Sequence, residues 1–97
     1  MPTLRCPAVL FYSPEDESSF FAWASKVPGI RRVTGEGRDI VLTLGTRTPS
    51  EDTLRELIGL FHRYKVPMKQ LAAFERPSNT AWFRNTSAYW YRKVFTE

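Results

Sequence analysis

Two residue types that commonly carry nucleophilic or metal chemistry occur only once each in the 97-residue chain, cysteine as Cys6 and histidine as His62. A thiol needs a nearby base to act as a nucleophile, so these two side chains would have to meet. Helical spacing places His62 at the edge of the polar side of an amphipathic stretch, and a split βαβ arrangement would hold Cys6 far from it. The sequence therefore predicts a surface histidine, a lone thiol and no catalytic residue.

Three consecutive acidic residues, Glu15, Asp16 and Glu17, form a second candidate site, because carboxylate oxygens bind hard cations. Adjacent residues on one helical turn point in different directions, and no second acidic cluster offers the remaining ligands. Ser13 and Pro14 precede the three acids, and this order is typical of a helix start, where negative charge stabilises the positive end of the helix dipole. We expect a helix start here, with no metal and no other cofactor.

The last third of the chain combines aromatic with basic residues. The net charge of the protein is +4, and most of the excess lies in residues 66–97. Large aromatic side chains there have two interpretations, burial against the rest of the domain and contact with a partner, because Tyr, Trp and Arg are common in binding hot spots. Burial is expected for Trp82, Phe83, Trp90 and Phe95. The residues expected to contact a partner protein or a second copy of the chain are Arg84, Tyr89, Tyr91, Arg92 and Lys93.

The elements that must position these residues alternate between strands and helices. Residues 8–12 are an unbroken apolar run, which predicts a buried first strand, and the helix that starts at Ser13 and Pro14 should end before Pro28. Two further strands, residues 30–34 and 39–44, flank a glycine-containing loop and predict a β-hairpin whose second strand is central in the sheet.

A second amphipathic helix is predicted from the capping sequence at Thr48 to about Tyr64. Residues 68–74 have two interpretations. A strand there would complete a β-α-β-β-α-β order, whereas the absence of β-branched residues favours a helix. We favour the strand.

The element order over residues 8–74 resembles the ferredoxin-like fold, an α+β sandwich, which implies that residues 77–95 form a helical extension outside it. Residues 61–95 also resemble small uncharacterised bacterial proteins, a resemblance that implies bacterial origin and no particular activity. The residues that carry it are Phe61, Arg63, Tyr64, Gln70, Leu71, Ala72, Asn79, Trp82, Phe83, Tyr89, Trp90, Val94 and Phe95.

Length and composition predict one domain over residues 1–97. One cysteine cannot form an intrachain disulfide, and we find neither a secretory signal nor an apolar run long enough to span a bilayer. We therefore expect a cytoplasmic protein with no membrane contact.

The predicted function is a non-catalytic protein-interaction or regulatory module. The alternative is a nucleic-acid-binding protein that uses the basic last third, with a helix-turn-helix over residues 49–75 presenting Lys69, Gln70 and Arg76 to DNA. RNA binding through the sheet is disfavoured, because residues 39–44 carry no aromatic side chain on which a base could stack.

Overall fold

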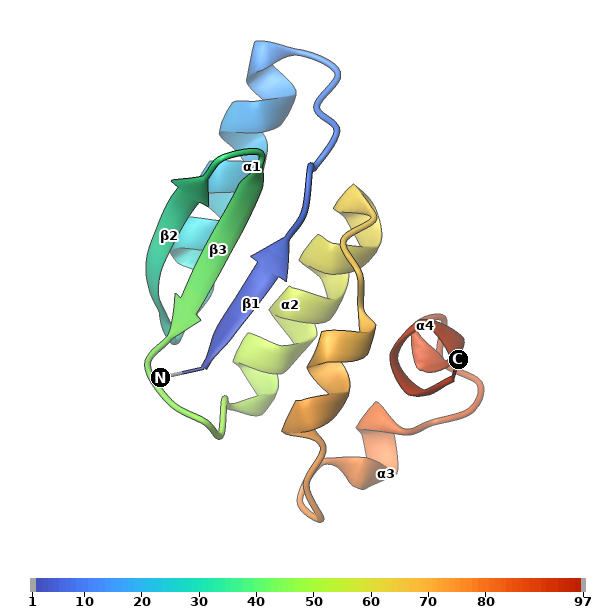
Figure 1. Ribbon diagram of the computed structural model, residues 1–97. Helices are drawn as coiled ribbons and strands as arrows, with labels where there is room; N and C mark the ends of the chain where they lie inside the picture. The colour runs from blue at the N-terminus through green and yellow to red at the C-terminus, as the bar shows by residue number, and fades with distance from the viewer. Residues whose placement is uncertain (1, 97) are drawn as a thin grey trace.

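The structure, a computed structural model, describes residues 2–96 and is of the α+β class. Strands β1, β2 and β3 form an antiparallel sheet, with α1 and α2 against one face of it (Figure 1). In chain order the elements are β1 (Thr3–Cys6), α1 (Pro14–Lys26), β2 (Ile30–Glu36), β3 (Asp39–Leu44), α2 (Glu51–Tyr64), the 3-10 helix η1 (Lys69–Phe74), α3 (Thr80–Phe83) and α4 (Tyr91–Phe95).

The first strand lies earlier in the chain than the apolar run predicts. Residues 8–12 form a loop between β1 and α1, so the predicted strand is wrong. Within β1, Leu4 and Cys6 are buried on the inner face and pair with Leu42 and Ile40 of β3. The strand stops where Ala8, next to Pro7, adopts a left-handed backbone with φ of 45°.

The predicted hairpin and its central strand are confirmed. The order β1-β3-β2 places β3 between two partners, with Ile40, Leu42 and Leu44 buried on the inner face. The hairpin turn lies later than expected: β2 continues through Glu36, and Gly37 makes the turn with φ of 64°, which glycine adopts without strain.

Both long helices begin with a serine cap. Ser13 accepts a hydrogen bond from the Asp16 N–H at 3.1 Å, as predicted. For α2 the cap is Ser50, which accepts from the Thr53 N–H at 3.2 Å, so the predicted start at Thr48 is two residues early. The side chain of Trp23 joins the two helices, since its indole N–H donates to Glu56 on α2 at 2.9 Å.

The strand predicted over residues 68–74 is wrong, because Lys69–Phe74 is the 3-10 helix η1. The side-chain amide of Gln70 instead lies along the open edge of β1. It accepts from the Arg5 N–H at 3.0 Å and donates to the Arg5 carbonyl at 2.8 Å. One side chain thus makes the pair of hydrogen bonds that a fourth strand would make, and the sheet of the described residues has three strands.

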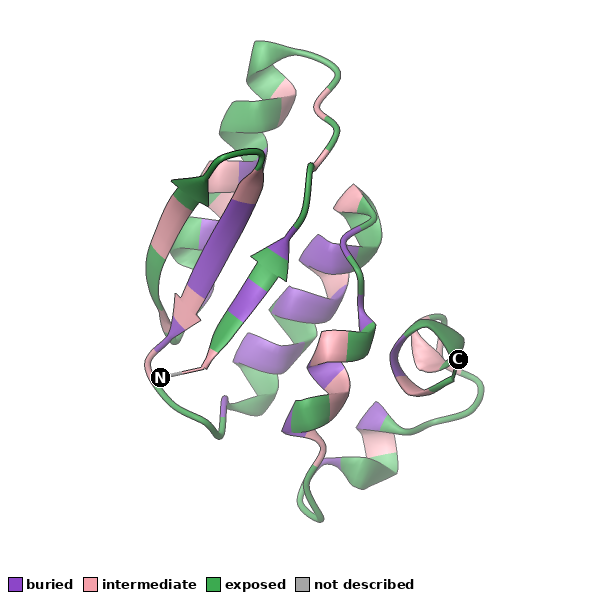
Figure 2. Cartoon of the chain, in the orientation of Figure 1, coloured by how far each residue is buried: buried purple, intermediate pink, exposed green. Residues whose placement is uncertain are grey.

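The C-terminal segment folds back onto the rest of the chain, as the burial interpretation predicts. Phe83 and Val94 are fully buried, and Trp82, Trp90 and Phe95 are half-buried against the same core (Figure 2). In Figure 1, η1 lies between α2 and this segment. Helix α2 is therefore covered on one side by the sheet and on the other by η1 and the C-terminal residues.

Candidate functional site

Cys6 and His62 lie in different environments. Cys6 is the last residue of β1 and has no exposed surface; burial, reinforced by the charge of Asp39, raises the pKa of its thiol to about 12. It therefore stays neutral, which is unsuited to nucleophilic chemistry. The expected position of Cys6 ahead of the first strand is wrong, but the predicted surface location of His62 is confirmed.

The acidic residues at the start of α1 serve the helix start. Asp16 accepts a hydrogen bond from the Tyr12 N–H at 3.0 Å, while Glu15 and Glu17 are exposed. Within residues 2–96, no three His, Cys, Asp or Glu side chains are grouped so that they could hold a metal ion.

Two of the predicted partner-binding residues make contacts within the chain. The guanidinium of Arg84 donates twice to Glu75 at 2.7 Å and lies 4.3 Å from the centre of the Phe95 ring. Its hydrogen bonds lower the pKa of the Glu75 carboxyl. Tyr91 is half-buried, with its ring centre 5.8 Å from that of Phe95. Arg84 thus connects Glu75, the residue after η1, to Phe95 of α4.

The other three predicted residues are exposed, and two of them lie against α2. The ring of Tyr89, 55% exposed, meets the His62 ring at 4.6 Å in an edge-to-face arrangement. The Lys93 Nζ lies 3.4 Å from the His62 Nδ1. Arg92 is exposed on α4, the short helix that also carries Lys93. The structure therefore brings Tyr89 and Lys93 to the end of α2.

A groove of about 390 Å³ lies beside Lys93, where the end of α2, the turn after it and α4 meet. Its apolar lining consists of the exposed Pro67 and of Phe61, Val66 and Met68, which are almost wholly buried in the core. Within the part of the chain that the structure describes, the charged residues that line it are all cationic, namely Lys65, Lys69 and Lys93. We call this hollow the lysine groove.

The turn that ends α2 shapes the lysine groove. Lys65 has a left-handed backbone with φ of 58°, and the N–H groups of Lys65 and Val66 both donate to the Phe61 carbonyl. This turn sends Val66 and Met68 into the core and leaves Lys65 exposed. Sequence reasoning missed the groove. The signal was an apolar run, residues 66–68, with a lysine on each side of it directly after a helix.

Comparisons with family models, curated proteins and solved structures found no match to this chain. No helix within residues 2–96 combines the length and the apolar character needed to cross a membrane. The resemblances drawn from the sequence stay predictions.

Proposed function

We propose that this protein is a non-catalytic interaction module that binds an acidic, partly apolar segment of a partner protein in the lysine groove. The observation that carries the proposal is the composition of the groove. An apolar wall is combined with three lysines, and among residues 2–96 no acidic residue lines it.

The two kinds of lining residue have different tasks. An exposed ion pair contributes only about 0–1 kcal/mol, so the lysines alone give weak binding. Burial of one large apolar side chain against Phe61, Val66 and Met68 adds about 1.5–3 kcal/mol. The apolar contact therefore supplies affinity, whereas the lysines select a negatively charged partner and speed its approach.

Residues 89–93, in and just before α4, complete the proposed surface and include residues that the sequence singled out. Lys93 lines the groove, and Tyr89, held against His62, adds an exposed ring next to it. Tyrosine suits a binding surface because it offers a large rigid area and a polar hydroxyl. Arg92 extends the positive charge along α4.

For the fold that carries the groove, we infer a three-stranded variant of the split βαβ arrangement of ferredoxin-like proteins. The strand order β1-β3-β2, with α1 and α2 on one face, supports this interpretation. In this view η1 takes the place of the fourth strand, and Gln70 occupies the edge of β1 at which that strand would pair.

The test is binding of a fluorescent peptide in which glutamate alternates with leucine, measured by anisotropy. Two matched peptides, one with lysine for glutamate and one with serine for leucine, separate the charge from the apolar contribution. We expect only the first peptide to bind well. The double variant Lys69→Glu, Lys93→Glu should weaken binding by about tenfold or more.

The control variant is Lys26→Glu, which makes the same kind of charge change at the exposed end of α1. Its affinity for the acidic peptide should match that of the wild-type protein to within about twofold. Equal weakening by Lys26→Glu would show attraction to the net charge of the protein. Binding unaffected by the groove double variant would also contradict the proposal.

Nucleic acid is the alternative ligand that the same experiment must exclude. A second helix does follow α2, but η1 has six residues and the amide of Gln70 is occupied by the Arg5 backbone. Duplex DNA and single-stranded RNA should therefore bind weakly at physiological salt. Sub-micromolar binding with a steep salt dependence, lost in the groove double variant, would replace the peptide proposal.

A further inference from the structure

The loop of residues 8–12 forms a second surface, separate in composition from the lysine groove. Although the segment is entirely apolar or aromatic, Leu10 is 64% and Tyr12 is 81% exposed. Val9 and Phe11 are half-buried and pack against the core. Alternation of inward and outward side chains is the pattern of an extended strand.

The backbone of this segment lacks strand partners. Among the described residues, the N–H and C=O groups of Val9, Leu10 and Phe11 make no hydrogen bond with other backbone groups, and the Tyr12 N–H donates to Asp16. A segment with unpaired backbone groups and exposed apolar side chains offers a place at which another strand can pair.

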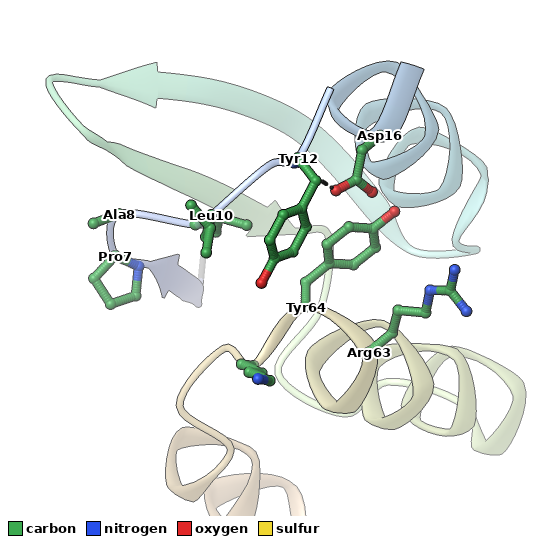
Figure 3. Close-up of a pocket in the computed structure, with 9 residues that line it drawn as sticks. Pro7, Ala8, Leu10, Tyr12, Asp16, Arg63 and Tyr64 are labelled. Carbon is green, nitrogen blue, oxygen red and sulfur yellow. Dashed lines mark hydrogen bonds between the residues drawn. The ribbon is translucent and has the colours of Figure 1, made fainter. Parts of the chain in front are cut away.

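Hollows flank the segment on both sides, so a strand can approach it. One, of about 310 Å³, lies between the loop and the end of α2, with Tyr12 and Tyr64 both beside it (Figure 3). The other, of about 400 Å³, lies between the loop and the β2-β3 hairpin.

We propose that residues 8–12 are a self-association site, at which two copies of this chain pair their segments as antiparallel strands about a two-fold axis. Such pairing would cover Leu10 and Tyr12 and would satisfy backbone groups without breaking any strand ladder of the single chain.

The charges around the segment indicate a second copy as the occupant. Arg38 follows the hairpin turn at Gly37 and lines the same hollow as Ala8 and Val9. Glu17, in the first turn of α1, lies toward the Tyr12 end, and both charged residues line the hollow on the hairpin side. Antiparallel pairing centred on Leu10 brings Arg38 of one copy toward Glu17 of the other, at both ends of the paired segment.

Sedimentation velocity over a range of protein concentrations tests the proposal. Wild-type protein should shift from monomer to dimer as concentration rises. The double variant Leu10→Lys, Tyr12→Lys should stay monomeric, because these exposed positions tolerate lysine in the folded chain and charge blocks strand pairing. Ala22→Lys, which adds the same charge at an exposed position of α1, should dimerise like the wild type.

Charge reversal tests the antiparallel arrangement. Arg38→Glu and Glu17→Arg should each weaken the dimer at low salt, and the two changes in one chain should restore it. Far-ultraviolet circular dichroism of every variant checks that it is folded. Wild-type protein that stays monomeric up to its solubility limit, a dimer unchanged in the Leu10→Lys, Tyr12→Lys variant, or failure of the double reversal to restore association would each overturn the proposal.

Discussion

The buried position of Cys6 sets both the ionisation and the accessibility of its thiol. The pKa of the thiol rises from 9.0 to about 12 on folding, so the folded chain keeps a proton that the unfolded chain loses. The contribution of Cys6 to stability is therefore present below pH 9 and is lost as pH rises toward 12.

We accordingly expect the difference in urea midpoint between the wild type and Cys6→Ala to shrink as pH is raised from neutral toward 12. At neutral pH, iodoacetamide should modify Cys6 only as fast as the chain unfolds. The tyrosines titrate in both proteins over this pH range, so subtracting the midpoint of Cys6→Ala at each pH from that of the wild type leaves the contribution of Cys6. Alkylation at the rate of a free thiol in native buffer would show that the thiol is accessible without unfolding.

Residue types predicted some of these local structures and missed others. Ser13, followed by proline and three acids, predicts its helix start because a cap depends only on neighbours in sequence. Gln70 carries no such signal, since its amide bonds to Arg5, 65 residues away. Lys65 and Lys93 likewise meet at the groove only because α4 packs against η1, near the end of α2.

At the scale of elements, the apolar run of residues 8–12 shows why a strand needs a partner as well as a pattern. Register places Asp39, the first residue of β3, level with Pro7, and the hairpin turns back at Gly37. The run therefore has no strand of its own chain beside it. The apolar pattern is wrong as a strand prediction here, because strand pairing depends also on the length of β3, and the local sequence of residues 8–12 carries no information about that length.

The C-terminal helices allow a sharper test of packing. Phe83 has no exposed surface, and its ring centre lies 4.8 Å from that of Phe95, so Phe83→Ala should destabilise the chain by about 3–5 kcal/mol. Trp90 donates its indole N–H to the Phe83 carbonyl at 2.7 Å. Trp90→Phe keeps most of the ring but loses this bond and should cost about 1 kcal/mol.

Urea denaturation of both variants measures these losses through the midpoint at constant slope. Lys93→Ala, an exposed change on α4, is the control and should leave the midpoint nearly unchanged. A normal midpoint for Phe83→Ala would show that the C-terminal helices are a passive extension that contributes nothing to the stability of the sheet and α2.

For the whole molecule, one cluster of buried side chains runs from the sheet through α2 to the C-terminal helices. It includes Leu42 of β3, Leu57 of α2, Leu71 of η1, and Phe83 and Val94 of the last two helices. The sequence predicted the α+β class, the hairpin and both long helices, because periodicity and caps are local. Two other features, the end of the sheet at three strands and the packing of the C-terminal helices against the core, depend on contacts between residues distant in sequence.

This arrangement predicts the order in which backbone amides exchange with solvent. Strand β3 is paired on both sides, so Ile40 to Leu44 should exchange only through global unfolding, with protection equivalent to about 5 kcal/mol or more. In dilute, monomeric protein, Val9, Leu10 and Phe11 should exchange nearly as fast as an unfolded chain, because their N–H groups have no backbone partner. Helix α4 should lie between these limits, since Val94 anchors a short helix that is otherwise partly exposed.

Exchange measured by nuclear magnetic resonance at low protein concentration gives this order residue by residue. Raising the concentration should slow exchange at Val9 to Phe11 alone if the segments pair, and the Leu10→Lys, Tyr12→Lys variant supplies the unpaired reference at the same concentration. Rapid exchange in β3 would contradict the central position of that strand. Strong protection of residues 9–11 in the monomeric variant would show that the segment already has partners within its own chain, and the physical basis for strand pairing between copies would be lost.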